Sequence, residues 1–333
     1  MNHLIVKDYK PILNTIETEK AIKFVRDNFE KILCKKLNLI RVSAPLFVNP
    51  SSGLNDNLNG YEKTVSFNIK GVKEEAEIVQ SLAKWKRYAL GKYGFNMYDG
   101  IYTNMNAIRK DEDLDALHSA YVDQWDWEKI IDYKDRNRNY LKKIVKEIYK
   151  TILKLASMVE SEYHIKHDLP KDIYFITTKE LEAMYPNNTP KERENLICKE
   201  KKAVFLMQIG LKLKNRLPHD GRAADYDDWK LNGDILLYNE VTKAAFELSS
   251  MGIRVDEVSL VNQLKAKNEL NKLDNPYCKD ILNKKLPYTI GGGIGQSRLC
   301  MFMLKKAHIG EVQASIWPEG VKEELESHNI YLL

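Results

Sequence analysis

Hydrophobic residues along this chain follow two periods, that of an α-helix and that of a β-strand. Apolar positions recur every three or four residues in several segments, which we predict to be helices: residues 18–35, 78–90, 138–163, a segment beginning at Asp256, and residues 296–306. Alternating or short apolar runs predict strands in the remaining segments: residues 37–47, 62–70, 100–109, 120–128, 203–209, 234–238 and 244–255.

The connections between the expected strands indicate the fold class. Residues 110–119 join two strands as a long hairpin, and hairpins dominate the other connections, so we expect a mostly antiparallel sheet with helices on its outside. Pro45 suits an edge or interface strand, because proline cannot donate to a central ladder. No linker rich in proline and glycine divides the chain, which predicts a single α+β domain over residues 1–333.

Composition narrows the class of protein only a little. A hydrophobic content of 44% is ordinary for a packed globular protein, and a net charge of +5 is too small an excess to indicate nucleic-acid binding. The four cysteines have no close metal-binding spacing. Cys34 and Cys300 are expected in the core, which fits a reducing, cytoplasmic location. The polar N-terminus lacks an apolar signal core, and no apolar run is long enough to span a membrane.

One expected strand, residues 121–128, carries polar groups that are hard to bury. Alternation puts Gln124 and Asp126 on one face and Trp125 and Trp127 on the other. The amide and the carboxylate, about 7 Å apart along the strand, need a polar ligand, water or a cation. An α-amino group would satisfy both, and a solvated strand face is the alternative.

Two arginines flank this region of the sequence. Arg109 ends one expected strand and offers planar, bidentate recognition of a phosphate, although a surface ion pair with Asp111 or Asp113 is the alternative. Glycines 291, 293 and 295 match neither a P-loop nor the dinucleotide fingerprint. Their spacing suits an extended strand whose bare face leaves room for a flat ring, or else tight helix–sheet packing. Arg298 then begins a helix, where it can stack on the ring or clamp phosphates.

Carboxylates at strand ends provide candidates for a metal site. Asp234 and Glu247 could hold Mg²⁺ beside a triphosphate, since Mg²⁺ prefers oxygen ligands. Asp227 and Asp228 are further candidates, although such an acidic loop is often only a solvated turn. His118 lies in the hairpin loop near this region.

Taken in order, these segments resemble the motifs of class II aminoacyl-tRNA synthetases. Residues 109–128 resemble the second motif, residues 291–298 resemble the third, and Pro45 resembles the interface proline of the first. Ser297 departs from the pattern, because the third motif usually has an acidic residue before its arginine. The chain is still more similar to the ammonia-dependent asparagine synthetase (aspartate–ammonia ligase) family. The matching segments cover almost its whole length: residues 81–86, 121–128, 226–229, 246–254 and 291–298.

The resemblance implies a class II synthetase-like fold with an eight-stranded, largely antiparallel sheet, and a homodimer. It implies that aspartate, ATP and ammonia give asparagine, AMP and pyrophosphate, with Mg²⁺ accompanying ATP. The residues implied for the nucleotide are Arg109, Leu117, Asp227, Asp234, Glu247, Leu248, Gly293 and Arg298, with Asp234 and Glu247 also meeting the metal. Those implied for aspartate are Ser81, Lys86, Gln124, Asp126 and Ser250, with Lys86 meeting the α-carboxylate. Arg109 and Arg298 would stabilise the charge that develops during adenylation.

Our mechanistic hypothesis is a β-aspartyl-AMP intermediate that ammonia then attacks. Asp56 would lie beside the reacting side chain, bind ammonium and take its proton, while Gln124 positions the acyl oxygen or the incoming nitrogen. Glutamine is not the expected donor, since Asn2 follows Met1 and no cysteine has the setting of a glutaminase nucleophile. Two alternatives are a tRNA-charging enzyme and a catalytically inactive amino-acid-binding paralogue. Against a tRNA-charging enzyme, we expect no extra anticodon-binding domain in this sequence. An inactive paralogue would not explain why Arg109, Arg298 and Glu247 are present.

Overall fold

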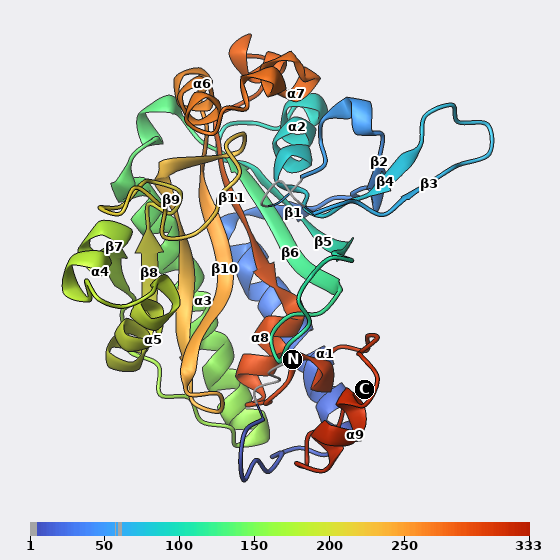
Figure 1. The fold of residues 1–333 in the computed structure, drawn as a ribbon, viewed down its shortest axis with the longest axis vertical. Coiled ribbons are helices and arrows are strands. Elements are labelled where there is room, and N and C mark those ends of the chain that lie inside the picture. The colour runs from blue at the N-terminus through green and yellow to red at the C-terminus, as the bar shows by residue number, and fades with distance from the viewer. Residues whose placement is uncertain (1–4, 57, 59–61) are drawn as a thin grey trace.

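A computed structural model describes residues 5–56, 58 and 62–333. Its centre is an eight-stranded sheet (Figure 1). In spatial order the strands are β1 (Leu39–Arg41), β5 (Gly100–Ile108), β6 (Tyr121–Ile130), β11 (Thr289–Gly295), β10 (Ala244–Arg254), β9 (Asp227–Asn239), β8 (Ala203–Met207) and β7 (Tyr174–Thr177). Only the two outermost pairs, β1 with β5 and β7 with β8, are parallel. The prediction of a mostly antiparallel sheet flanked by helices is therefore confirmed.

Two long helices cover one face of this sheet. In α1 (Thr15–Leu37) and α3 (Arg138–Tyr163) the apolar residues form one stripe, which packs into the main core against Trp125, Trp127 and their neighbours. Asn14 and Asn137 cap the two helices by accepting hydrogen bonds from backbone N–H groups of the first turn. The opposite face of the central strands is left free for the polar residues of β6.

Shorter elements surround this framework (Figure 1). They are α2 (Ala83–Tyr93), α4 (Thr178–Met184), α5 (Pro190–Lys201), α6 (Glu257–Ala266), α7 (Pro276–Leu282), α8 (Gln296–Met303), α9 (Val321–Glu326), and the 3₁₀ helices η1 (Pro50–Ser52), η2 (Tyr133–Asp135), η3 (Leu270–Asp274) and η4 (Ile309–Glu311). A separate small sheet contains β2 (Phe47–Val48), β4 (Ala76–Ile78) and β3 (Ser66–Phe67). Within the described residues, no helix combines the length and the apolar character needed to cross a bilayer.

Several predicted boundaries are wrong. The strand expected at residues 62–70 shrinks to β3, because none of those residues is buried and no core holds the segment extended. Residues 37–47 divide between β1 and the small sheet, and residues 78–90 contain the end of β4 before α2 begins. The strand expected at residues 234–238 is much longer, since β9 pairs with β10 along most of its length.

The glycine-rich segment is a strand, as predicted, and its register explains its composition. On β11, Gly293 lies opposite Asp126 of β6 and opposite Ser250 of β10. A Cβ on Gly293 would come within 3.0 Å of the Gln124 side chain, and one on Gly291 would collide with Glu128. The glycines thus leave space for polar side chains of the neighbouring strand, which the sequence interpretation did not include.

Candidate active site

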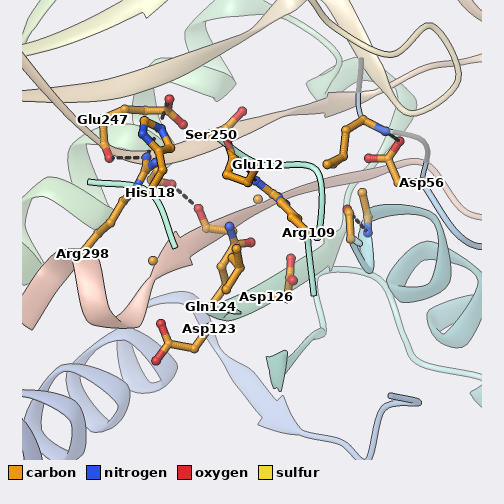
Figure 2. Close-up of a pocket in the computed structure, with 18 of the residues that line it drawn as sticks. Asp56, Arg109, Glu112, His118, Asp123, Gln124, Asp126, Glu247, Ser250 and Arg298 are labelled. Atoms are coloured by element: carbon orange, nitrogen blue, oxygen red, sulfur yellow. Dashed lines mark hydrogen bonds and ion pairs between the residues drawn. The ribbon is translucent and has the colours of Figure 1, made fainter. Parts of the chain in front are cut away.

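The polar face of the sheet forms the floor of a cavity of about 350 Å³ (Figure 2). All but one of the site residues expected from the sequence line it: Asp56, Ser81, Lys86, Arg109, Leu117, Gln124, Asp126, Asp227, Glu247, Leu248, Ser250, Gly293 and Arg298. They come from β6, β9, β10, β11, α2, α8 and the loops between the elements of the sheet. Asp234 does not line the cavity, and Asp228 points elsewhere and pairs with Arg136 at 3.1 Å.

One end of the cavity is formed by Arg298 and Glu247. The Nη1 atom of Arg298 donates to the Glu247 carbonyl at 3.0 Å and lies 3.9 Å from the Glu247 carboxylate. Burial raises the pKa of Glu247, but the guanidinium groups of Arg298 and Arg222 outweigh burial, so that the net shift is downward. Glu247 is therefore an anion between two cations, which suits a phosphate-binding region.

Arg109 lies across the cavity at the end of the β5–β6 hairpin (Figure 2). Its ion-pair partner is Glu112, at 3.9 Å, whereas the expected alternative partner Asp111 pairs with Lys110 at 2.9 Å. Among the residues that the structure describes, the buried Nε of Arg109 has no hydrogen-bond partner. The guanidinium is only loosely held and remains available for an anion.

The middle of the cavity contains a buried pair between Lys86 and Asp126. Lys86 is 1% exposed, and its Nζ donates to Asp126 Oδ1 and to the carbonyl of Gly292 at 2.9 Å. Burial lowers the pKa of Lys86, and Asp126 opposes this effect. Within the described residues the second oxygen of Asp126 has no hydrogen-bond partner. A free carboxylate oxygen beside a lysine can bind a zwitterion, because the carboxylate meets the ligand's positive group and the ammonium meets its negative group.

Arg254 lies in the floor of the cavity and was not expected as a site residue. It donates to Glu128 at 2.7–3.1 Å and pairs with Asp227, which raises its pKa well above the ordinary value despite burial. Asp227 is therefore committed to Arg254. Alternation along residues 244–255 could have found this arginine, because Ser250 and Arg254 are four residues apart on one strand and share its face.

Arg222 is a second cavity residue that the sequence interpretation missed. Its guanidinium contacts both carboxylate oxygens of Asp234 and so separates that residue from the cavity. Burial raises the pKa of Asp234 to about 7, with Arg222 opposing and Glu247 adding to the rise. Asp234 and Glu247 supply the oxygen donors that Mg²⁺ prefers, and they interact electrostatically, but a metal could use both only if Arg222 moved away. No group of three or more potential metal ligands occurs in the described part of the chain.

Asp56 lies at the opposite end of the cavity from Arg298 (Figure 2). It is 3% exposed, and its Oδ1 accepts a hydrogen bond from the Leu58 N–H at 3.0 Å. Oδ2 is buried and has no hydrogen-bond partner among the described residues. Burial raises the pKa of Asp56, while the Lys84 ammonium opposes the rise and Asp225 adds to it. Such a carboxylate is suited to accepting a proton.

A hydrogen-bond network in the wall of the cavity holds the start of α8. Asp123, on the aromatic side of β6, accepts hydrogen bonds from the backbone N–H of Ser297 at 3.0 Å and from its hydroxyl at 2.7 Å. Asp123 also accepts from Arg26 of α1 at 2.7 Å. The acid missing from position 297 is thus replaced by one from β6, which binds Ser297, the residue before Arg298.

Comparisons with known proteins agree in family and in fold. The family model for aspartate-ammonia ligase matches residues 16–329. Curated relatives named aspartate–ammonia ligase include that of Ruminiclostridium cellulolyticum, 57% identical with both chains fully covered, and that of Clostridium tetani, 58% identical over 99% of this chain and 97% of the relative.

Among solved structures, asparaginyl-tRNA synthetase from Entamoeba histolytica, in complex with asparaginyl-adenylate, aligns with a TM-score of 0.64 and 14% identity. The alignment covers 90% of this chain and 66% of the synthetase. Asparaginyl-tRNA synthetase from Pyrococcus horikoshii, complexed with asparaginyl-adenylate, aligns with a TM-score of 0.61 and 16% identity. That alignment covers 90% of this chain and 70% of the synthetase. These similarities confirm the predicted class II synthetase-like fold.

Proposed function

Because the chain belongs to the aspartate–ammonia ligase family and makes asparagine from aspartate and ammonia, we propose that it does so through a β-aspartyl adenylate. The observation that supports this proposal is that one cavity holds Arg109 and Arg298 at separate points and the Lys86–Asp126 pair between them. ATP and aspartate, with five or more charged groups between them, need such a cavity to react side by side.

The nucleotide is proposed to bind over Gly293 and Leu248, with its phosphates between Arg109 and Arg298. Both guanidinium groups have spare donors, since the contacts they make are long or involve a carbonyl. Their positive charge would stabilise the pentacovalent phosphorus of adenylation, which carries more negative charge than the ground state.

Aspartate is proposed to bind along β6. Its amino group would meet Gln124 and the free oxygen of Asp126, and its α-carboxylate would meet Lys86, with Ser81 and Ser250 completing the contacts. This placement leaves the β-carboxylate between the phosphates and Asp56. Arg254 supports the floor beneath these residues and holds Asp227 and Glu128 as neutralised partners.

Mg²⁺ is the proposed companion of ATP, with Glu247 and Asp234 as its candidate ligands. When bound it would neutralise phosphate charge and orient the pyrophosphate leaving group. Arg222 holds Asp234 in the present arrangement, and we propose that it exchanges this carboxylate for phosphate oxygens when the nucleotide binds.

The reaction then has two steps. An oxygen of the aspartate β-carboxylate attacks the α-phosphorus, and the bond to pyrophosphate breaks as pyrophosphate leaves with its electron pair. Ammonium next gives one proton to the carboxylate of Asp56, and the resulting ammonia attacks the acyl carbon. The carbon–oxygen bond to AMP breaks, a second proton leaves the nitrogen, and asparagine is formed. The raised pKa of Asp56 supports its role as the proton acceptor.

We also propose that the chain is one catalytic domain and that it forms a homodimer. The edge of the sheet at β1 supports the dimer, because Ile40 is 58% exposed there and Leu46 and Phe47 lie exposed nearby. Sedimentation analysis should give twice the monomer mass, and a monomer would contradict the proposal. The four free thiols support a reducing, cytoplasmic location.

Product analysis tests the proposed function. The purified protein is incubated with ATP, Mg²⁺ and aspartate, and AMP and asparagine are measured with ammonium, with glutamine or with tRNA. We expect stoichiometric AMP and asparagine with ammonium only. AMP formation that depends on tRNA would indicate a charging enzyme, and absence of AMP under every condition would indicate an inactive amino-acid-binding protein.

A further inference from the structure

A second cavity, of about 290 Å³, meets the active-site cavity at Asp56, Leu58 and Ala223, which line both. We call it the side cavity. Its remaining lining comes from the segment of residues 50–55, from Glu77 of β4, from Lys84 of α2, from Asp225 before β9, and from residues between α6 and α7. The proposed binding of ATP and aspartate uses none of these residues.

The carboxylate of Asp56 lies at the junction of the two cavities. Asn55 holds its backbone, since Asn55 Oδ1 accepts the Asp56 N–H at 2.9 Å and the Gln80 N–H at the same distance. The buried Oδ2 of Asp56 has no described partner within hydrogen-bond distance, although, against the larger rise from burial, the Tyr226 side chain is near enough to lower the pKa of Asp56. An unpartnered carboxylate oxygen between two polar cavities is costly unless a small donor occupies the space beside it.

The charges of the side cavity suit a small cation. Lys84 pairs with Asp225 at 3.1 Å, and Lys272 pairs with Glu269 at 2.9 Å, so these four charges neutralise one another. Glu77 has only the Asn55 amide, at 3.3 Å, as a described partner. Two carboxylates, those of Asp56 and Glu77, are then left with one cation in the lining, Lys267, so the lining has an excess of negative charge. Ammonium is close to water in size and donates up to four hydrogen bonds, so the side cavity has room for it.

The order of residues along the active-site cavity also favours a second route. Arg298 and Glu247 lie at the nucleotide end of the active-site cavity, and Asp56 lies at the other end, with Gln124 and Asp126 between (Figure 2). Once the adenylate has formed, AMP occupies the nucleotide end and leaves toward it. Ammonia must then reach the acyl carbon from the side of Asp56.

From these observations we propose that the side cavity is the entrance through which ammonium reaches Asp56 and the adenylate, separate from the opening used by ATP and aspartate. This inference rests on the proposed two-step function. It assigns Glu77 a role in attracting ammonium and none in adenylation.

Charge variants of Glu77 test the proposal. Aspartate-dependent exchange of pyrophosphate into ATP, measured without ammonia, reports adenylation, and asparagine formation at varied ammonium reports the second step. For Glu77→Lys we expect KM for ammonium to rise about tenfold, since a reversed charge repels rather than concentrates the cation. The exchange rate and the KM values for ATP and aspartate should stay within about twofold. Glu77→Gln, which keeps an acceptor for Asn55, should give a smaller rise in KM for ammonium.

The control is Glu75→Lys, an equal change of charge two residues away at an exposed position outside both cavities. It should leave KM for ammonium unchanged. The proposal is overturned if Glu77→Lys leaves that KM unchanged, if Glu75→Lys raises it equally, or if Glu77→Lys impairs exchange as much as synthesis. Failure of the proposed function would look different, because the unmodified protein would then show no aspartate-dependent exchange at all.

Discussion

Replacement of Asp123 by asparagine should impair adenylation although Asp123 lies on the aromatic side of β6. The residue is buried and accepts four hydrogen bonds: from Arg26 Nη2 at 2.7 Å, from Ser297 N at 3.0 Å, from Ser297 Oγ at 2.7 Å and from Gln313 Nε2 at 3.3 Å. Asparagine keeps the shape and one oxygen but removes the negative charge. Its amide nitrogen must face groups that are themselves donors.

The cost follows from those contacts. The Ser297 hydroxyl can rotate to accept from the new amide, and the Ser297 N–H can keep the remaining oxygen. The pair with Arg26 is lost, and a charge-assisted hydrogen bond contributes about 1.5–3 kcal/mol. Because the Arg26 side chain is 32% exposed, water recovers part of this, so we expect unfolding free energy to fall by about 2 kcal/mol.

The effect on activity should be larger than the effect on stability suggests. Ser297 is in the first turn of α8, so a loosened Asp123 shifts the adjacent Arg298. A displacement of about 1 Å at a catalytic group can cost up to a hundredfold, and we expect aspartate-dependent pyrophosphate exchange to fall about tenfold or more.

Urea unfolding and pyrophosphate exchange are the two assays, and Arg26→Met is the matched control. Arg26→Met removes the same ion pair from the α1 side, together with the hydrogen bond from Arg26 to the Ser297 hydroxyl at 3.1 Å. It should lose similar stability while keeping exchange within about threefold, because Asp123 still accepts from both the N–H and the hydroxyl of Ser297. The reasoning is refuted if both variants lose exchange equally, or if Asp123→Asn exchanges at the unmodified rate.

Three further predictions concern the floor and the two ends of the cavity. Gly293→Ala should raise KM for aspartate about tenfold in the exchange assay with little loss of stability, because the new Cβ displaces the flexible Gln124 side chain. An unchanged KM would contradict the close approach of Gly293 to Gln124. Arg254→Met should lower the free energy of unfolding, measured in urea, by about 3–5 kcal/mol, since it leaves Glu128 and Asp227 buried without their cation. A loss below about 1 kcal/mol would show that these two ion pairs do not stabilise the fold. The rate of asparagine formation at saturating substrates should fall as pH drops through the raised pKa of Asp56, because only the ionised carboxylate accepts the proton. The rate of pyrophosphate exchange should not fall over this pH range. An equal fall in both rates would mean that another group titrates.

The parts of the fold that depend on regular burial were predictable from the sequence. The helix expected over residues 138–163 is α3, residue for residue, because its apolar stripe packs along the sheet without interruption. Alternation on β6 separated the tryptophans from Gln124 and Asp126 for the same reason, since one face packs in the core and the other lines a cavity.

Contacts between distant segments were not predictable. Arg222 and Asp234 meet because an irregular loop folds over β9, and no period in residues 210–226 indicates where that loop goes. The short elements β7, α4 and α5 were not predicted, since each contains few apolar residues. The two helices α4 and α5 depend on capping by Thr177 and Thr189. The nearest the sequence came to the Asp123 network was the departure at Ser297, whose meaning depends on a residue 174 positions away.

The central claim is that a β-carboxylate oxygen of aspartate is transferred to AMP. The direct measurement uses aspartate labelled with ¹⁸O in the β-carboxylate, with ATP, Mg²⁺ and ammonium, followed by mass spectrometry of AMP and pyrophosphate. The two-step mechanism predicts one ¹⁸O atom in each AMP and none in pyrophosphate. Unlabelled AMP, or label in pyrophosphate or in released phosphate, would contradict the adenylate.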